Sequence, residues 1–435
     1  MICHLAFMAA RSFGEPVAVT PQPAFDAEVL RVREALAAGK ISEANAGLQA
    51  VCALNSLPVY PAARAGTCYH FLGLTAMKDS RIDEAPGLFQ RAAEAWRAAG
   101  PEYKETWGNT QLIIADLFQR QHRPAKATEA INRYLTELSR AEQSQRPEAL
   151  SRLALAYADL GRRSLARATI QESLAGFEAL SEPRPAEAAY ARNTLGVVSL
   201  SMGRQEEAEA NLRRAVELAT QALGEGHLDT VGYQTNLALA LLSRGDTDGA
   251  EILLRRARYV VEKQPGASGN QLGMICAELS AIAVIRNKLA VAGEEARKAL
   301  DMLSHQKWPD QRAIALAQVN LADVHMHANR LAEAENLLNQ AIPAERANSP
   351  DSRLLADGIR RVAQLRAQQQ RWKEAAEAYR EAIEIYDHVV GTGNPAVASL
   401  LREYAETLKR EGGPKTEIRE VESRAKALLS FAGKR

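Results

Sequence analysis

A period of about 42 residues runs through most of this 435-residue sequence. One alanine recurs in register in each unit, and these anchor alanines are Ala44, Ala85, Ala127, Ala166, Ala208, Ala250, Ala292, Ala334 and Ala375. Glu417 stands in the register of a tenth. Repetition at this length is typical of stacked structural units that bury one continuous core between neighbours. Ten units of this size fill almost the whole chain, so we expect no separate globular domain.

Small residues recur at two further distances from the anchors. Twelve residues before the anchor stand Gly73, Ala115, Ala154, Gly196, Ala238, Ser280, Ala322, Ala363 and Ala405, and seven after it stand Ala92, Ala215, Ala257, Ala299, Ala341 and Ala382. The first unit departs from the earlier column, with Val32. Small residues at facing positions allow two helix axes to approach closely. The pattern therefore predicts two closely packed helices in each unit.

A third column marks the turn between these two helices. Five residues before the anchor, most units have glycine or asparagine, namely Gly39, Gly161, Gly203, Gly245, Gly412, Asn287 and Asn329. These two residue types tolerate the left-handed conformation that ends a helix. Ser80, His122 and Gln370 are the exceptions. Since strong helix formers dominate and aromatic residues make up only 5% of the chain, the sequence predicts an all-α fold.

The spacing of these columns resembles the tetratricopeptide repeat, in which Leu-Gly or Leu-Ala is followed after twelve and nineteen residues by alanine. The 42-residue period, the loop from Leu223 to His227 and the run Asn236-Leu237-Ala238 resemble the kinesin-light-chain subtype. The resemblance implies a right-handed superhelical solenoid of about ten antiparallel helix pairs. It also implies that the first helices line a concave groove that binds peptide segments of other proteins. Residues 1–25 hold no heptads of the kind that join a kinesin light chain to its motor, so motor binding is not expected.

The chain divides into three predicted segments. Residues 1–25 are an N-terminal tail or a shortened signal segment, residues 26–411 form an array of about nine repeats, and residues 412–435 form the final repeat helix and C-terminal cap. The cap is predicted from Gly412-Gly413-Pro414 and the apolar stripe that follows it, formed by Ile418, Val421, Ala425 and Leu428.

The resemblance places groove-facing side chains 18, 15, 14, 11, 8 and 7 residues before each anchor. The candidate peptide-binding residues in these columns are Tyr190, Asn193, Asn236, Leu239, Leu242, Asn320, Met326, Arg360, Arg361 and Arg402. Amides suit a peptide backbone because each offers a donor and an acceptor. The apolar residues would bury side chains of the ligand, and the arginines favour an acidic stretch or a terminal carboxylate. The alternative is that the apolar columns belong to the stacking core and the arginines to a solvated face.

Catalytic and metal-binding motifs have weak support. His325 and His327 lie two residues apart, which places them on different sides of a helix. Gly224-Glu225-Gly226 and Gly391-Thr392-Gly393 lack the preceding strand and the Gly-Lys-Ser/Thr continuation of a phosphate loop. We find no nucleophile motif. We expect a protein that is not an enzyme and that needs no cofactor or metal.

Charge and hydropathy narrow the classes of partner. The 54 Lys and Arg residues nearly balance the 53 Asp and Glu residues, leaving a net charge of +1, so we expect no nucleic-acid partner. No apolar run approaches the roughly 20 residues that a membrane span needs, so we expect no membrane insertion. Residues 2–10 are apolar but lack the basic start of a secretory signal. A cytoplasmic location is favoured, and an exported or periplasmic location is the alternative if the N-terminus is a truncated signal peptide.

Four cysteines, Cys3, Cys52, Cys68 and Cys276, are too few and too scattered for a disulfide framework or a Cys-x-x-Cys metal site. We expect buried or incidental thiols, and whether Cys52 pairs with Cys68 is left open.

The leading functional hypothesis is a non-enzymatic scaffold that captures a protein or peptide segment in the groove of the repeat array. The first alternative is a ligand- or peptide-sensing regulator, which would need an output module such as a helix-turn-helix, and none is visible in residues 1–25. The second alternative is an accessory subunit of an envelope or secretion complex.

Overall fold

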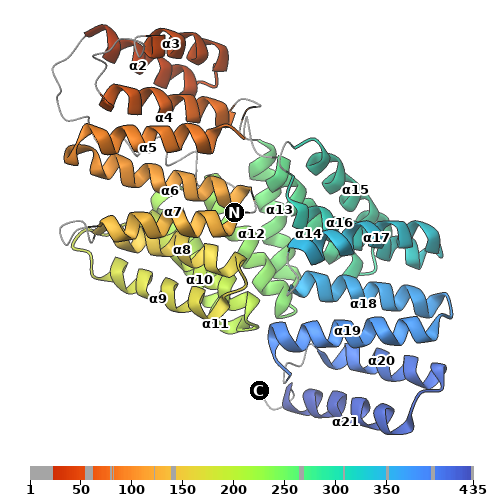
Figure 1. Ribbon diagram of the computed structural model, residues 1–435. Helices are drawn as coiled ribbons and strands as arrows, with labels where there is room; N and C mark the ends of the chain where they lie inside the picture. The colour runs from red at the N-terminus through yellow and green to blue at the C-terminus, as the bar shows by residue number, and fades with distance from the viewer. Residues whose placement is uncertain are drawn as a thin grey trace. The chain divides into compact units, whose positions relative to one another are not determined.

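The computed structural model describes residues 23–53, 62–78, 81, 83–121, 123–138, 144–263, 269–306, 309–348, 352–392 and 397–432. These residues form twenty α-helices and one short 3-10 helix, and no β-strand occurs among them. Within each compact unit, consecutive helices run antiparallel and lie side by side (Figure 1). The predicted all-α fold of helix pairs is therefore confirmed. Residues 1–22 of the predicted N-terminal segment, and Ser80 and His122 of the turn column, lie outside the described residues.

The chain divides into two compact units, and the boundary in the sequence falls between Pro183 and Arg184. The described helix pairs of the first unit are α2 (Pro23–Ala37) with α3 (Ile41–Ala53), α4 (Ala62–Lys78) with α5 (Ala85–Ala99), α6 (Lys104–Arg120) with α7 (Pro124–Glu137), and α8 (Arg146–Asp159) with α9 (Arg163–Glu178). The 3-10 helix η2 (Pro101–Tyr103) precedes α6. Each pair matches one sequence repeat, with the anchor alanine on its second helix.

The second unit continues the same pattern. Its described pairs are α10 (Pro185–Ser201) with α11 (Gln205–Leu223), α12 (Leu228–Ser243) with α13 (Thr247–Glu262), α14 (Gly269–Ile285) with α15 (Leu289–Ser304), α16 (Gln311–His327) with α17 (Leu331–Asn348), α18 (Arg353–Gln368) with α19 (Trp372–Val390), and α20 (Val397–Glu411) with α21 (Lys415–Ala432). Within this unit each helix packs against the next one along the chain.

The small-residue columns lie at the helix crossings. All nine anchor alanines are fully buried, and so are the alanines that stand seven residues after an anchor. Gly196, twelve residues before its anchor, shows why size matters there, because a Cβ atom added to it would lie 2.5 Å from the Leu212 side chain. In the first pair the arrangement is reversed. The larger Val32 is accommodated by Gly47 on the second helix, where a Cβ atom would lie 2.7 Å from Val32.

The turn column adopts the predicted left-handed conformation. Gly203 has a φ angle of 71°, and Asn287 and Asn329 have φ angles of 54° and 55°. Gln370, an exception in the sequence, also has a positive φ angle, of 60°. The geometry of the turn is thus imposed by the repeat even where the residue type does not favour it.

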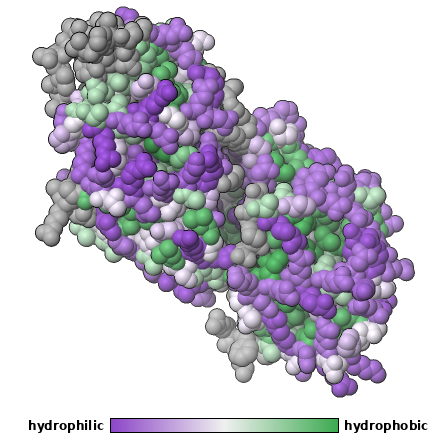
Figure 2. Space-filling model, in the orientation of Figure 1, coloured by the Kyte–Doolittle hydropathy of each residue, from purple (hydrophilic) through white to green (hydrophobic). Residues whose placement is uncertain are grey.

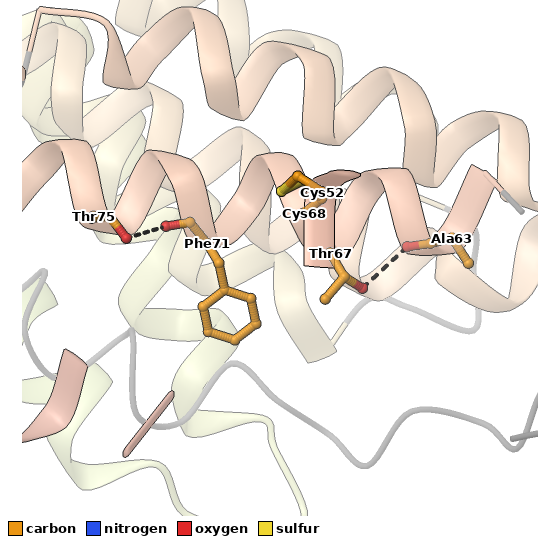
Figure 3. The surroundings of a disulfide bond; sticks show 6 residues. All are labelled: Cys52, Ala63, Thr67, Cys68, Phe71 and Thr75. Carbon is orange, nitrogen blue, oxygen red and sulfur yellow. Dashed lines mark hydrogen bonds between the residues drawn. A yellow bond between two sulfur atoms is a disulfide. The ribbon is translucent and has the colours of Figure 1, made fainter. Parts of the chain in front are cut away.

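Cys52 on α3 and Cys68 on α4 form a disulfide, with their Cα atoms 5.7 Å apart (Figure 3). This corrects the expectation of unpaired thiols at these two positions. The bond joins the second helix of the first repeat to the first helix of the next, which are in contact. Around it, Thr67 and Thr75 donate hydrogen bonds to the carbonyl oxygens of Ala63 and Phe71 within α4. Cys276 remains a buried free thiol, and burial raises its pKa to about 12.

Candidate functional site

The candidate residues all lie on the first helices of the second unit, which are α10, α12, α14, α16, α18 and α20. The anchor position of each pair lies on its second helix. It is a fully buried alanine in every pair of this unit except α20 with α21, where it is Glu417. In the space-filling view, apolar side chains are visible between hydrophilic ones over this unit (Figure 2).

Two of the three candidate asparagines bond to each other. The side-chain amide of Asn236 on α12 donates to the Oδ1 atom of Asn193 on α10 over 2.8 Å. Asn320 on α16 donates from its Nδ2 atom to the backbone carbonyl of Ala277 on α14 over 3.0 Å. Both bonds join residues 43 positions apart, one more than the period. The asparagines therefore connect neighbouring first helices, and only Asn236 is partly exposed while Asn193 and Asn320 are buried.

Two of the candidate arginines are also paired within the protein. Arg360 on α18 donates from its Nε atom to the Oε2 atom of Glu403 on α20 over 3.0 Å. Arg361 forms an ion pair of 3.4 Å with the buried carboxylate of Asp323 on α16 and donates to Gln364. Arg402 is exposed and forms no ion pair with any described residue. Of the three arginines, it alone is available to an acidic ligand without breaking a bond.

The apolar candidates differ in exposure. Tyr190 and Met326 are buried, so they contribute to the core rather than to a binding surface. Leu239 and Leu242 on α12 are partly exposed. On α14, Ile285 lies seven residues before Ala292, in the last groove-facing column, and is 64% exposed. Surface apolar area thus remains on α12 and α14.

The first unit shows one related arrangement. The guanidinium of Arg152 on α8 is only 2% exposed and contacts Asp116 on α6 at 3.2 Å and Glu148 on its own helix at 3.1 Å. Arg152 and Arg361 both lie fourteen residues before an anchor, and their aspartate partners both lie eleven residues before the preceding anchor. The same inter-repeat ion pair therefore occurs in both units.

The structure reveals a polar residue that the sequence analysis did not select. Glu278 lies on α14, fourteen residues before Ala292, in the column that also contains Asn236 and Asn320. It is partly buried, and burial raises the pKa of its carboxyl to about 7. Arg312 opposes this rise and Asp310 adds to it. Glu278 could have been selected from its column alone, because it lies one period from each of the selected asparagines Asn236 and Asn320.

The histidine pair does not form a metal centre. His327 donates from its Nδ1 atom to the carbonyl oxygen of Asp323 over 2.9 Å, and the Asp323 carboxylate faces Arg361. Within the described part of the chain, no group of three or more His, Cys, Asp or Glu residues is arranged to hold a metal ion. Among the same residues, no helix is long and apolar enough to cross a membrane.

Comparison with known families agrees with the repeat geometry. The family described as Tetratricopeptide repeat matches residues 145–220, 187–263 and 313–387. These matched residues carry tetratricopeptide repeats. No curated protein matches the sequence. The first family match begins one residue before α8, and the matches cover helix pairs whose anchors include Ala166, Ala208 and Ala250.

Two solved structures with TM-scores above 0.5 share this fold of helix pairs, and a third matches with a lower score. A Rap protein complexed with Competence and Sporulation Factor has 13% identity and a TM-score of 0.57, and the match covers 84% of this chain and 98% of that one. The apo form of the quorum sensor NprR from B. thuringiensis has 14% identity and a TM-score of 0.54, covering 83% and 98%. Putative kinesin light chain repeats from Podosopora anserina have 19% identity and a TM-score of 0.38, covering 47% and 97%.

Proposed function

We propose that this tetratricopeptide-repeat protein is a non-enzymatic scaffold that binds a peptide segment of a protein partner along the first helices of its second unit. The observation that carries the proposal is the partly exposed apolar surface of α12 and α14, formed by Leu239, Leu242 and Ile285 beside the polar side chain of Asn236. A surface that combines apolar contacts with a few placed polar groups suits a peptide better than a small charged metabolite.

The pairing of the asparagines changes how they would contribute. Because Asn236 already donates to Asn193, its Oδ1 atom and second N–H remain the groups that a peptide backbone would use. Asn320 is buried against the carbonyl of Ala277, so its proposed role is to hold α14 and α16 together. Among the arginines, Arg402 is the proposed contact for an acidic residue or a terminal carboxylate of the ligand. The proposed role of Arg360 and Arg361 is to join neighbouring first helices through their bonds to Glu403 and Asp323.

A random peptide library displayed on phage, selected against the full chain, tests this proposal. Selected peptides should bind the Leu239→Gln plus Ile285→Gln variant at least tenfold more weakly than the unmodified chain, because apolar contact area is lost. The matched control is Ile252→Gln plus Val291→Gln, which changes exposed apolar residues on the second helices α13 and α15. Equal losses in both variants would contradict the assignment to the first helices.

A peptide-sensing regulator is the second candidate. The specific support is the fold similarity, over more than four fifths of the chain, to a Rap protein complexed with Competence and Sporulation Factor and to the quorum sensor NprR. In this form of the proposal, peptide binding changes how the chain contacts a further partner. A peptide-dependent change in hydrogen exchange on the second helices would support sensing, whereas protection limited to the first helices would favour the plain scaffold.

The disulfide between Cys52 and Cys68 is an indicator of the cellular compartment in which the protein is located. Bonds of this kind persist in oxidising environments and are rare in the cytosol. The Cys52–Cys68 bond therefore favours the exported location, the alternative in the sequence analysis, over the cytoplasmic one. Mass spectrometry of protein alkylated at harvest from its natural source tests this, since alkylation of both thiols would restore the cytoplasmic interpretation.

A further inference from the structure

Polar side chains form a row along the first helices of the second unit, fourteen residues before successive anchors. The inner row is defined as Asn236, Glu278, Asn320, Arg361 and Glu403. Four of these residues bond to a neighbouring first helix, as described above. Glu278 is the exception, because it has no hydrogen bond and no ion pair within 4 Å among the described residues.

Glu278 has no bond to the preceding repeat because of the residue that faces it there. The bonds of Asn236, Asn320 and Glu403 all reach a residue 43 positions earlier. For Glu278 that residue is Thr235, whose hydroxyl donates instead to the carbonyl of Val231 in its own helix over 3.0 Å. A threonine committed to its own backbone leaves the carboxylate with no donor from the preceding repeat.

The neighbouring helices supply no ion pair within 4 Å of Glu278 among the described residues. α14 packs against α13, α15 and α16, and Glu278 is the only charged residue in its own helix. Arg258 of α13 and Glu295 of α15 bond to each other over 2.8 Å, so they neutralise one another. Arg312 of α16 lowers the pKa of Glu278, and Asp310, the residue before α16, raises it. Arg312 therefore compensates the carboxylate only in part, and it forms no ion pair with Glu278 within 4 Å.

The surface beside Glu278 is apolar. Met274 and Ala281 lie four residues before it and three after it, on the same face of α14, and both are partly exposed. Leu239 occupies the corresponding surface of α12. A long cationic side chain matches this arrangement, because its aliphatic stem packs on apolar surface while its charged end reaches a carboxylate.

We infer that Glu278 is the recognition point for a lysine or arginine side chain of the bound peptide, with apolar residues flanking that cation in the ligand. The inference rests on the proposed function and specifies its ligand. The cation completes the one position of the inner row that the fold leaves without a partner. A partly buried carboxylate gains more from such a partner than an exposed one does.

Binding of this cation is linked to the protonation of Glu278. Because burial raises the pKa of Glu278 to about 7, the carboxyl is partly protonated near neutral pH, and a bound cation favours its ionised form. Affinity for a basic peptide should therefore rise between pH 6 and pH 8 and stay constant in Glu278→Gln. Calorimetry in two buffers of different ionisation enthalpy should detect proton release on binding near pH 7.

The test compares phage-displayed random peptide selections against the full chain, Glu278→Lys and the control Glu333→Lys, which changes an exposed residue of α17. The unmodified chain and the control should enrich peptides with one basic residue among apolar ones, whereas Glu278→Lys should enrich an acidic residue at that position. Synthetic forms of the selected peptide, with lysine or norleucine at that position, should differ by about tenfold or more in affinity for the unmodified chain.

The outcomes separate the two proposals. Selected peptides without basic enrichment, or with the same preference for Glu278→Lys, would overturn the role of Glu278 and leave peptide binding intact. Failure to select any peptide would contradict the proposed function and the role of Glu278 with it. Circular dichroism confirms folding of each variant, and Glu278→Gln, which has nearly the same shape, provides the binding comparison should Glu278→Lys fail to fold.

Discussion

The hydroxyl of Ser280 donates a hydrogen bond to the backbone carbonyl of Ala292 over 2.8 Å. Ser280 belongs to the small-residue column of the first helices, and Ala292 is the anchor of its pair. The bond shows how closely the two helices approach at the crossing, since a side chain with a single heavy atom beyond Cβ reaches the opposite backbone. Larger side chains in this column should therefore displace the helices.

Ala238→Leu should destabilise the protein by about 1–3 kcal/mol, because Ala238 is fully buried beside the anchor column and extra methylene groups have no space. Urea denaturation monitored by circular dichroism measures the change. Ala210→Leu is the matched control, since Ala210 is exposed on the second helix α11. An unchanged midpoint for Ala238→Leu would contradict the placement of the crossings.

Gln370→Gly should stabilise the protein by about 1 kcal/mol. Gln370 is exposed and has a φ angle of 60°, a conformation that costs about 1–2 kcal/mol for a residue with a side chain. The gain is reduced by the greater chain entropy of glycine in the unfolded state. The reverse change, Gly245→Gln, should lower the thermal midpoint. A lower midpoint for Gln370→Gly would show that its side chain matters more than its backbone.

Arg152→Met should cost about 3 kcal/mol or more, because it leaves Asp116 and Glu148 without the buried guanidinium that they share. Adding Asp116→Asn and Glu148→Gln to this variant should recover part of the loss, since the unpaired charges are then removed. Arg133→Met is the comparison, and breaking its exposed pair with Glu129 should cost less than about 1 kcal/mol. Similar losses for the two single variants would contradict the role of burial.

Glu278→Gln should stabilise the protein at pH 8 but not at pH 4.5. The folded pKa of Glu278, about 7, lies above the ordinary glutamate pKa of 4.5, so the folded state holds a proton that the unfolded state releases as the pH rises between these values. Stability is therefore lost over that range in the unmodified chain and not in the variant. At 1.36 kcal/mol per pKa unit, the difference is at most about 3 kcal/mol. A difference independent of pH would show that the carboxyl titrates normally.

The repeat positions were predictable from the sequence because they depend on residue size alone. The anchor column selects alanine at a helix crossing, and a fixed interval then places both helices of each pair. The behaviour of Gln370 was not predictable from its type, since the repeat on either side imposes the left-handed conformation. The pairing of Cys52 with Cys68 was also not predictable from the spacing of the cysteines, because it depends on how closely α3 approaches α4.

The helices that carry the candidate residues were predictable from the sequence, but the bonds that these residues form were not. Column positions correctly placed Asn193 and Asn236 on first helices of the second unit, but they did not show that the two amides bond to each other. The stagger between neighbouring first helices decides this, because it sets the bonding interval at 43 residues rather than 42. Glu278 could not be recognised from the sequence, because it is one of many acidic residues in the chain. It becomes notable only when the structure shows that the other residues of the inner row are paired.

The disulfide between Cys52 and Cys68 closes a covalent ring that contains every peptide bond between these two residues, whose sequence separation is 16. A protease that cuts the chain once inside this ring would not release the helices α2 and α3 that precede the cut. The cleaved protein would migrate as a single species in a non-reducing gel and separate into two fragments after reduction. The first repeat is thus secured against loss by backbone cleavage as well as by packing.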